Sequence, residues 1–130
     1  MSDELVALAT RLIGYDTSEP EAVHEAAGFV KGWLEARGID AHEEGVRGLP
    51  VLRAEVGPEE APTVVLHGHL DVVPGHRDQF EPQLDGDRLY GRGAYDMKGA
   101  LAAMLISRPR AVSVKLTGKS EMTRKWYFSA

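Results

Sequence analysis

The sequence predicts an α/β domain built as a layered central sheet with flanking helices. Two segments with helical periodicity come first, and three strand-like segments follow them. The third strand-like segment, Thr63–Leu66, is a short apolar run without alternation, which is typical of a strand covered on both faces. A chain of 130 residues has room for one domain, so these elements are expected to share one core.

Two helices are predicted before residue 39. The first follows Ser2, a plausible N-cap, and the second begins at Pro20 and ends at Gly38. Apolar residues recur at helical spacing in both: Leu5, Leu8, Ala9, Leu12 and Ile13 in the first, and Val23, Ala26, Ala27, Val30 and Leu34 in the second. His24 lies in the second helix and is given no role.

The period changes after the second helix. Residues 39–44 and 51–56 alternate and read as strands, with Gly45 and Gly48 in the turn between them. Residues 74–93 form a long irregular stretch, and such a stretch inside a compact domain is usually functional. A helix is expected over 97–106, and the aromatic residues of 124–130 favour a final strand.

Composition excludes several classes of protein. Hydrophobic residues make up 43% and charged residues 27%, as in ordinary globular domains, and no apolar run is long enough to cross a membrane. The acidic start does not resemble a signal peptide, so we expect a cytoplasmic protein. Without cysteine, any metal must be held by His, Asp or Glu.

The net charge is uneven along the chain. Residues 1–104 carry −10 and residues 105–130 carry +5. A basic tail is one signature of nucleic-acid binding, but no aromatic-basic motif accompanies this charge. We therefore interpret it as a solvated surface and expect no nucleic-acid partner.

The first candidate site directly follows the apolar run: His67-Gly-His69-Leu-Asp71. In an extended chain, residues two apart point the same way, so these side chains can share a face. The carboxyl end of a central strand is where open α/β sheets place ligands. Imidazole binds zinc well, and a ligating His commonly donates its other N–H to a carboxylate. The alternative is a set of polar residues that only cap a strand.

The second candidate site is the glycine-rich segment 89–99, which contains Asp96. Its glycines permit a tight, specifically shaped loop. Asp96 then stands at the entry of the next helix, where an Asp that acts only as an N-cap is the alternative interpretation. Gly91-x-Gly93 matches half of a dinucleotide fingerprint, but a third glycine and a preceding strand are missing.

Together the two segments are more specific than either alone. The strings Val64-Val-Leu-His-Gly-His-Leu-Asp-Val-Val-Pro74 and Leu89-Tyr-Gly-Arg-Gly-Ala-Tyr-Asp-Met-Lys-Gly99 resemble the zinc aminoacylase and exopeptidase family of acetylornithine deacetylase, succinyl-diaminopimelate desuccinylase and carboxypeptidase G. The resemblance covers about residues 3–105 and leaves 106–130 as a divergent tail. It implies that residues 1–130 are the N-terminal part of a catalytic domain.

The resemblance implies a role for three residues. His69 matches a ligand of one of two metal ions, and Asp96 matches the carboxylate that bridges both. Asp71 matches the catalytic acid that orients this His and raises its basicity. His67 stands at a position that the family fills variably and receives no ligand role. His42 and His76 match nothing functional.

The resemblance also implies a reaction. Two zinc ions, with Co²⁺ as an alternative, activate water and polarise an amide carbonyl, and a Glu acts as general base. The substrate is an N-acyl amino acid or a short peptide, and full-length family members are expected to form homodimers. The Glu-Glu pair that supplies the base in the family is expected after a strand like 127–130, and it is not in this sequence. We therefore expect an N-terminal fragment that is inactive by itself.

Two other interpretations stay open. The chain could be a stand-alone module that binds a metal or a partner without catalysis, and it would then be folded and monodisperse. Alternatively, His67 and His69 could be the paired ligands of an unrelated barrel amidohydrolase. Two helices before the motif and no room for eight strands count against the barrel.

Overall fold

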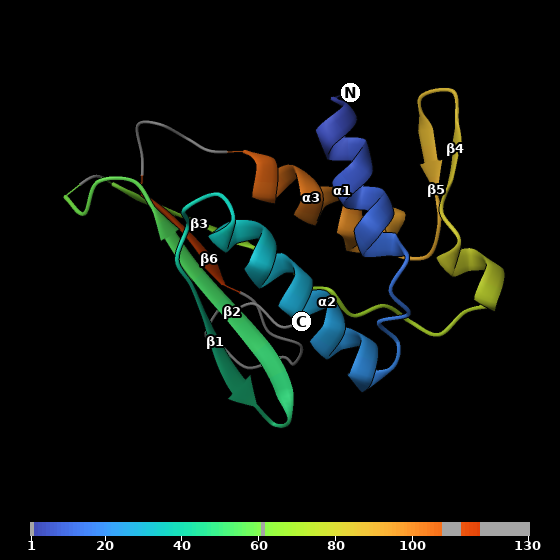
Figure 1. The fold of residues 1–130 in the computed structure, drawn as a ribbon, viewed down its shortest axis with the longest axis horizontal. Helices are drawn as coiled ribbons and strands as arrows, with labels where there is room; N and C mark the ends of the chain where they lie inside the picture. Colours follow the sequence, from blue (N-terminus) through green and yellow to red (C-terminus); the bar gives the residue numbers. More distant parts are fainter. Residues whose placement is uncertain (1, 61, 108–112, 118–130) are drawn as a thin grey trace.

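A computed structural model gives the fold (Figure 1) and describes residues 2–60, 62–107 and 113–117. Strands β1 (Ala41–Val46), β2 (Leu49–Val56), β6 (Ser113–Thr117) and β3 (Thr63–His67) form a sheet in the order β1-β2-β6-β3. β1 and β6 lie antiparallel to β2, whereas β3 runs parallel to β6. The predicted α/β class with flanking helices is confirmed.

Helix α1 (Asp3–Ile13) begins where its sequence predicts. The Ser2 hydroxyl accepts a hydrogen bond from the Leu5 amide at 3.3 Å, which satisfies one of the free N–H groups at the start of the helix. Its apolar stripe is buried from Leu8 to Ile13, with Leu12 and Ile13 at zero exposed surface, whereas Leu5 is only partly buried. The stripe therefore anchors the last turn of α1 in the core, next to the loop that leads to α2.

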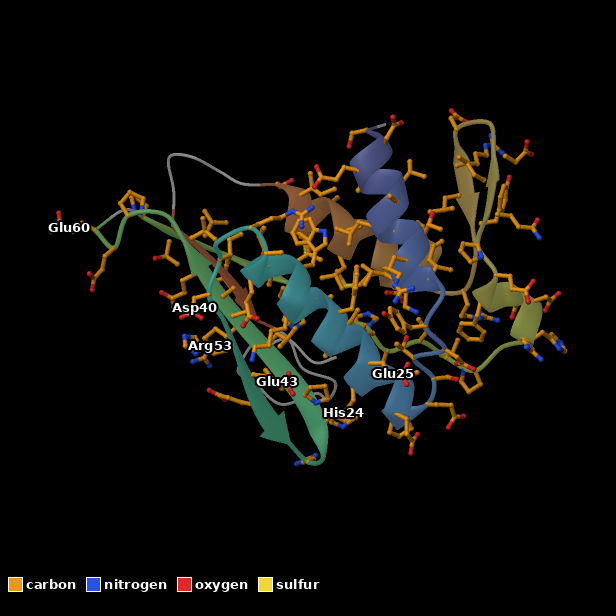
Figure 2. All side chains as sticks on the ribbon, in the orientation of Figure 1. His24, Glu25, Asp40, Glu43, Arg53 and Glu60 are labelled. Carbon is orange, nitrogen blue, oxygen red and sulfur yellow. The ribbon has the colours of Figure 1, made fainter. Side chains whose placement is uncertain are left out.

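Helix α2 (Pro20–Glu35) also agrees with the prediction. Pro20 occupies its first turn, and Gly38 follows its end with φ +72°, a conformation that favours glycine. The helix packs against β1 and β2 and buries the apolar residues that predicted it. His24 lies on this helix near the β1–β2 hairpin (Figure 2), and its Nε2 is 2.9 Å from the Gly48 carbonyl oxygen.

The expectation that Thr63–Leu66 is covered on both faces is wrong. Within the described residues, β3 pairs only with β6, so it lies at an edge of the sheet. Val64 is 44% exposed and Val65 is 51% exposed. An uninterrupted apolar run predicts a strand correctly, but it does not determine how many neighbours the strand has.

The stretch 74–93 contains more regular structure than its sequence suggests. A 3₁₀ turn spans Arg77–Phe80, and β4 (Gln83–Asp85) pairs with β5 (Arg88–Tyr90) in a short antiparallel hairpin. Gly86 has φ +59° at the first position of the two-residue turn Gly86-Asp87, where a type II′ hairpin turn favours glycine. This hairpin lies apart from the main sheet, beyond α1 (Figure 1).

Helix α3 (Gly99–Ile106) lies within the predicted range of 97–106 and packs against α1. A single π-helical turn over Ala94–Lys98 precedes it. Its buried residues are Leu101, Ala102 and Leu105, which join the core formed by α1, α2 and the sheet. The strand expected over 124–130 lies outside the described residues.

No helix in the described part of the chain is both long and apolar enough to span a bilayer.

Candidate metal centre

A cavity of about 780 Å³ lies beyond the carboxyl end of β3. Its walls come from residues 69–74, from 78–83 and from 90–96, so both sequence motifs contribute to it. His69, Asp71 and Asp96 all line it, whereas His67, the last residue of β3, does not. The fold therefore brings together the three residues that the sequence singled out.

The imidazole of His69 is oriented by contacts on both ring nitrogens. Nδ1 lies 3.0 Å from the Asp71 carbonyl oxygen and 3.3 Å from Asp71 Oδ1, while Nε2 lies 3.1 Å from Asp96 Oδ1. A neutral ring with its proton on Nδ1 donates toward Asp71. In that tautomer Nε2 carries the lone pair that a metal ligand needs, whereas in the protonated ring its N–H donates to Asp96 Oδ1.

The Asp71 carboxylate dominates the electrostatics of His69. Its contact with Nδ1 is the largest cause that raises the pKa of His69 from 6.5 to about 9, while burial of the ring acts in the opposite direction. The same contact lowers the pKa of Asp71 below its usual value. Asp71 Oδ1 is buried, and the His69 ring is the polar group that lies against it, at 3.3 Å.

Asp96 does not act as a helix N-cap. It lies inside the π-helical turn with extended backbone angles (φ −126°, ψ 98°) and precedes a cis peptide bond to Met97. Its side chain is 78% exposed and makes its 3.1 Å contact with His69 rather than with a backbone amide. The alternative interpretation of Asp96 as only a capping residue is therefore wrong.

The glycine at position 93 is needed for the two motifs to meet. Gly93 has φ +78°, and a Cβ at this position would lie 2.6 Å from Val72 Cγ1 and 3.2 Å from Lys98 Cδ. Only a residue without a side chain lets this backbone lie so close to residue 72. Gly93 thus shapes the loop against the His69 segment, which explains this glycine without a dinucleotide.

The donor set fits part of a zinc site. Two ligands at about 2.0–2.1 Å from a tetrahedral zinc ion lie about 3.3 Å apart, close to the 3.1 Å between His69 Nε2 and Asp96 Oδ1. Within the described ranges, no group of three or more His, Cys, Asp or Glu is arranged to hold a metal. A complete metal site at this wall would therefore need ligands beyond His69 and Asp96.

Two buried polar residues behind the site were not singled out from the sequence. Thr17 is 1% exposed, and its Oγ1 donates to the Leu70 carbonyl oxygen at 2.5 Å. Lys98 has no exposed surface, and its Nζ donates to the Tyr15 carbonyl oxygen at 2.7 Å. Burial lowers the pKa of Lys98 to about 8, against the opposing charge of Asp16.

One sequence signal could have identified Lys98. It stands three, four and seven residues before Leu101, Ala102 and Leu105, so a continuous helix would place it on their buried face. A lysine on an apolar stripe requires a buried partner. Thr17 has no comparable local signal because its partner lies 53 residues away.

The site and the fold define a metallohydrolase-like α/β domain, and comparisons with known proteins agree. Residues 65–110 match the model of Peptidase family M20/M25/M40. A succinyl-diaminopimelate desuccinylase of Erythrobacter litoralis is 41% identical over 93 residues, which cover 67% of this chain and 24% of that protein. A protein of Pyrococcus abyssi named as a LysW-lysine/LysW-ornithine hydrolase is 40% identical over 83 residues, 64% of this chain and 23% of its own.

A solved structure gives the same answer. The M20 family metallo-carboxypeptidase of Sulfolobus solfataricus superposes with a TM-score of 0.74 and 27% identity, over 89% of this chain and 30% of that one. The resemblance stated from the two motifs is confirmed: the chain has the sequence and fold of the N-terminal part of M20-family enzymes. It spans about a quarter of the length of the curated relatives it matches.

Proposed function

We propose that this chain supplies part of the metal site of a hydrolase that cleaves amide bonds, of the deacylase or carboxypeptidase type. The observation that supports it most is the 3.1 Å approach of His69 Nε2 to Asp96 Oδ1 at the wall of the cavity. The matched relatives are themselves named as hydrolases, among them a desuccinylase and a metallo-carboxypeptidase.

In this proposal each of the three residues has one role. His69 would hold a metal ion through Nε2, and Asp96 would supply the carboxylate that the family resemblance assigns to both ions. Asp71 holds the His69 ring through Nδ1 and increases the electron density at Nε2. The raised pKa of His69, to about 9, agrees with a ring whose basicity a carboxylate increases.

The ion that suits this donor set is Zn²⁺, with Co²⁺ as a functional substitute. Imidazole and carboxylate are common zinc ligands, and bound zinc supplies Lewis acidity that polarises an amide carbonyl and acidifies water. The described residues provide two donors to the site. We therefore propose that the 130-residue chain binds zinc weakly and does not hydrolyse amides by itself.

The proposed substrate is an N-acyl amino acid or a short peptide. The cavity wall mixes the polar side chains of the site with Val73, Tyr90 and Tyr95, which are 68%, 51% and 97% exposed. Such a wall suits a small amphipathic molecule placed against the metal donors. We propose a cytoplasmic enzyme that is a homodimer at full length.

Zinc titration of point variants tests the proposal. Isothermal titration calorimetry with ZnCl₂ should show binding to the wild-type chain. His69→Ala and Asp96→Ala, which each lose a ligand, should bind zinc more weakly by at least the roughly 10–100-fold that loss of an outer partner costs. His67→Ala is the matched control, because His67 precedes His69 by two residues and does not line the cavity. It should keep wild-type affinity.

Two results would contradict the proposal. Equal losses in His67→Ala and His69→Ala would favour paired imidazole ligands, as in a barrel amidohydrolase. Rapid hydrolysis of N-acetyl or N-succinyl amino acids by the purified 130-residue chain with zinc would contradict its inactivity.

A further inference from the structure

We infer that Thr17 and Lys98 are positioning residues, which fix the His69 segment and the Asp96 segment to one loop and so set the spacing of the two metal donors. The loop is Tyr15–Thr17, between α1 and α2. We call this loop, together with the Lys98 side chain that contacts it, the Tyr15–Thr17 bracket. The inference rests on the proposed metal site and goes beyond it, because neither residue contacts the metal donors.

The bracket holds the His69 segment through two hydrogen bonds. The Thr17 hydroxyl donates to the carbonyl of Leu70, the residue between His69 and Asp71, at 2.5 Å. The Val72 amide donates back to the Thr17 carbonyl at 3.3 Å. The backbone on both sides of Asp71 is thereby fixed to a single residue of the loop.

The bracket holds the Asp96 segment through Lys98. The ammonium group donates to the Tyr15 carbonyl at 2.7 Å, across 83 residues of sequence. The Lys98 amide also donates to the Gly93 carbonyl at 2.8 Å, which closes the turn that contains Asp96. Residues 15 and 17 thus contact the two segments that approach each other at the His69–Asp96 contact.

Their own packing holds the two metal donors unequally. The side chain of Asp96 is 78% exposed and that of His69 is 29% exposed. Thr17 and Lys98 are 1% and 0% exposed, and Leu12 and Ile13 bury the end of the helix that leads into the loop. A site needs its ligands held by a buried supporting layer, and this bracket is that layer within the described residues.

Paired variants with a stability control test the bracket. Thr17→Val removes the hydroxyl at nearly constant volume, and Lys98→Met removes the ammonium group and keeps an unbranched chain. Thr17→Ser restores the hydroxyl. Val30→Ala, at a 5% exposed core position on α2, destabilises the fold without touching the bracket. The two bracket variants break different hydrogen bonds, so each is an independent test if the other fails to fold.

Zinc affinity of the full 130-residue chain, measured by competition with a chromophoric chelator, is the readout. Thr17→Val and Lys98→Met should bind zinc roughly tenfold or more weakly. Thr17→Ser and Val30→Ala should keep wild-type affinity. Nuclear magnetic resonance of the metal-free variants should show a weakened His69–Asp96 contact and faster exchange of the Val72 amide in Thr17→Val.

The outcomes separate this inference from the proposed function. Losses of affinity in Thr17→Val and Lys98→Met no greater than in Val30→Ala, with zinc binding intact in the wild type, would overturn the bracket alone. A wild-type chain that binds no zinc would overturn the proposed metal site and the inference that rests on it. An affinity loss confined to the bracket variants and restored by serine supports the inference.

Discussion

The substitution Asp71→Asn should release the proton of His69 at a much lower pH in the metal-free chain. The variant keeps the volume of the side chain and removes its charge. In the wild type, the pKa of His69 is raised from 6.5 to about 9, and the Asp71 side chain is the largest cause of this rise. The rise corresponds to a roughly 300-fold higher proton affinity of the ring. Without the Asp71 charge, burial of the ring lowers the pKa against the remaining effects of the Asp71 carbonyl and Asp96.

The expected pKa of His69 in Asp71→Asn is therefore close to its ordinary value. Because the ring is partly exposed and solvent screens its partners, we set the minimum expected fall at about one pKa unit, or tenfold in proton affinity. The assay is a titration of the His69 ring resonances by nuclear magnetic resonance. Asp78→Asn, another carboxylate that lines the cavity, is the control and should leave this pKa in place. An unchanged pKa in Asp71→Asn would refute the orienting role of Asp71.

Three further predictions concern stability. The free energy of unfolding of the metal-free chain should fall as pH rises from about 6.5 to about 9, because the raised pKa of His69 stabilises the fold only while the ring is protonated. Urea titrations at several pH values measure this fall, and it should be absent in Asp71→Asn. Gly93→Ala should destabilise the fold by about 2 kcal/mol or more, since a Cβ meets Val72 at positive φ, whereas Gly32→Ala, with open space on α2, should stabilise it by up to about 1 kcal/mol. Leu12→Ala should cost about 3 kcal/mol in thermal unfolding, because Leu12 is fully buried; a cost below about 1 kcal/mol would place Leu12 outside the core.

Local sequence signals predicted the helices well. Ser2 and Pro20 set the starts of α1 and α2, and Gly38 follows the end of α2, as the sequence indicates. These signals work because capping, the fixed φ of proline and the freedom of glycine act within a few residues. The buried stripes of both helices followed from spacing alone for the same reason.

Features set by distant partners were predicted less well. The apolar run at Val64 and Val65 indicated a covered strand, but burial depends on neighbouring strands, and β3 lies at the sheet edge. The two motifs predicted His69, Asp71 and Asp96 as a group, yet the contact between His69 and Asp96 spans 27 residues of sequence. Thr17 was missed because only the fold brings it to Leu70.

The central claim is that His69 and Asp96 bind the same zinc ion. The most direct measurement is a crystal structure of the zinc-loaded chain with anomalous diffraction recorded at the zinc absorption edge. We expect an anomalous peak about 2.0–2.2 Å from both His69 Nε2 and Asp96 Oδ1. A zinc ion bound through His67, or the absence of a peak between His69 and Asp96 at saturating zinc, would contradict it.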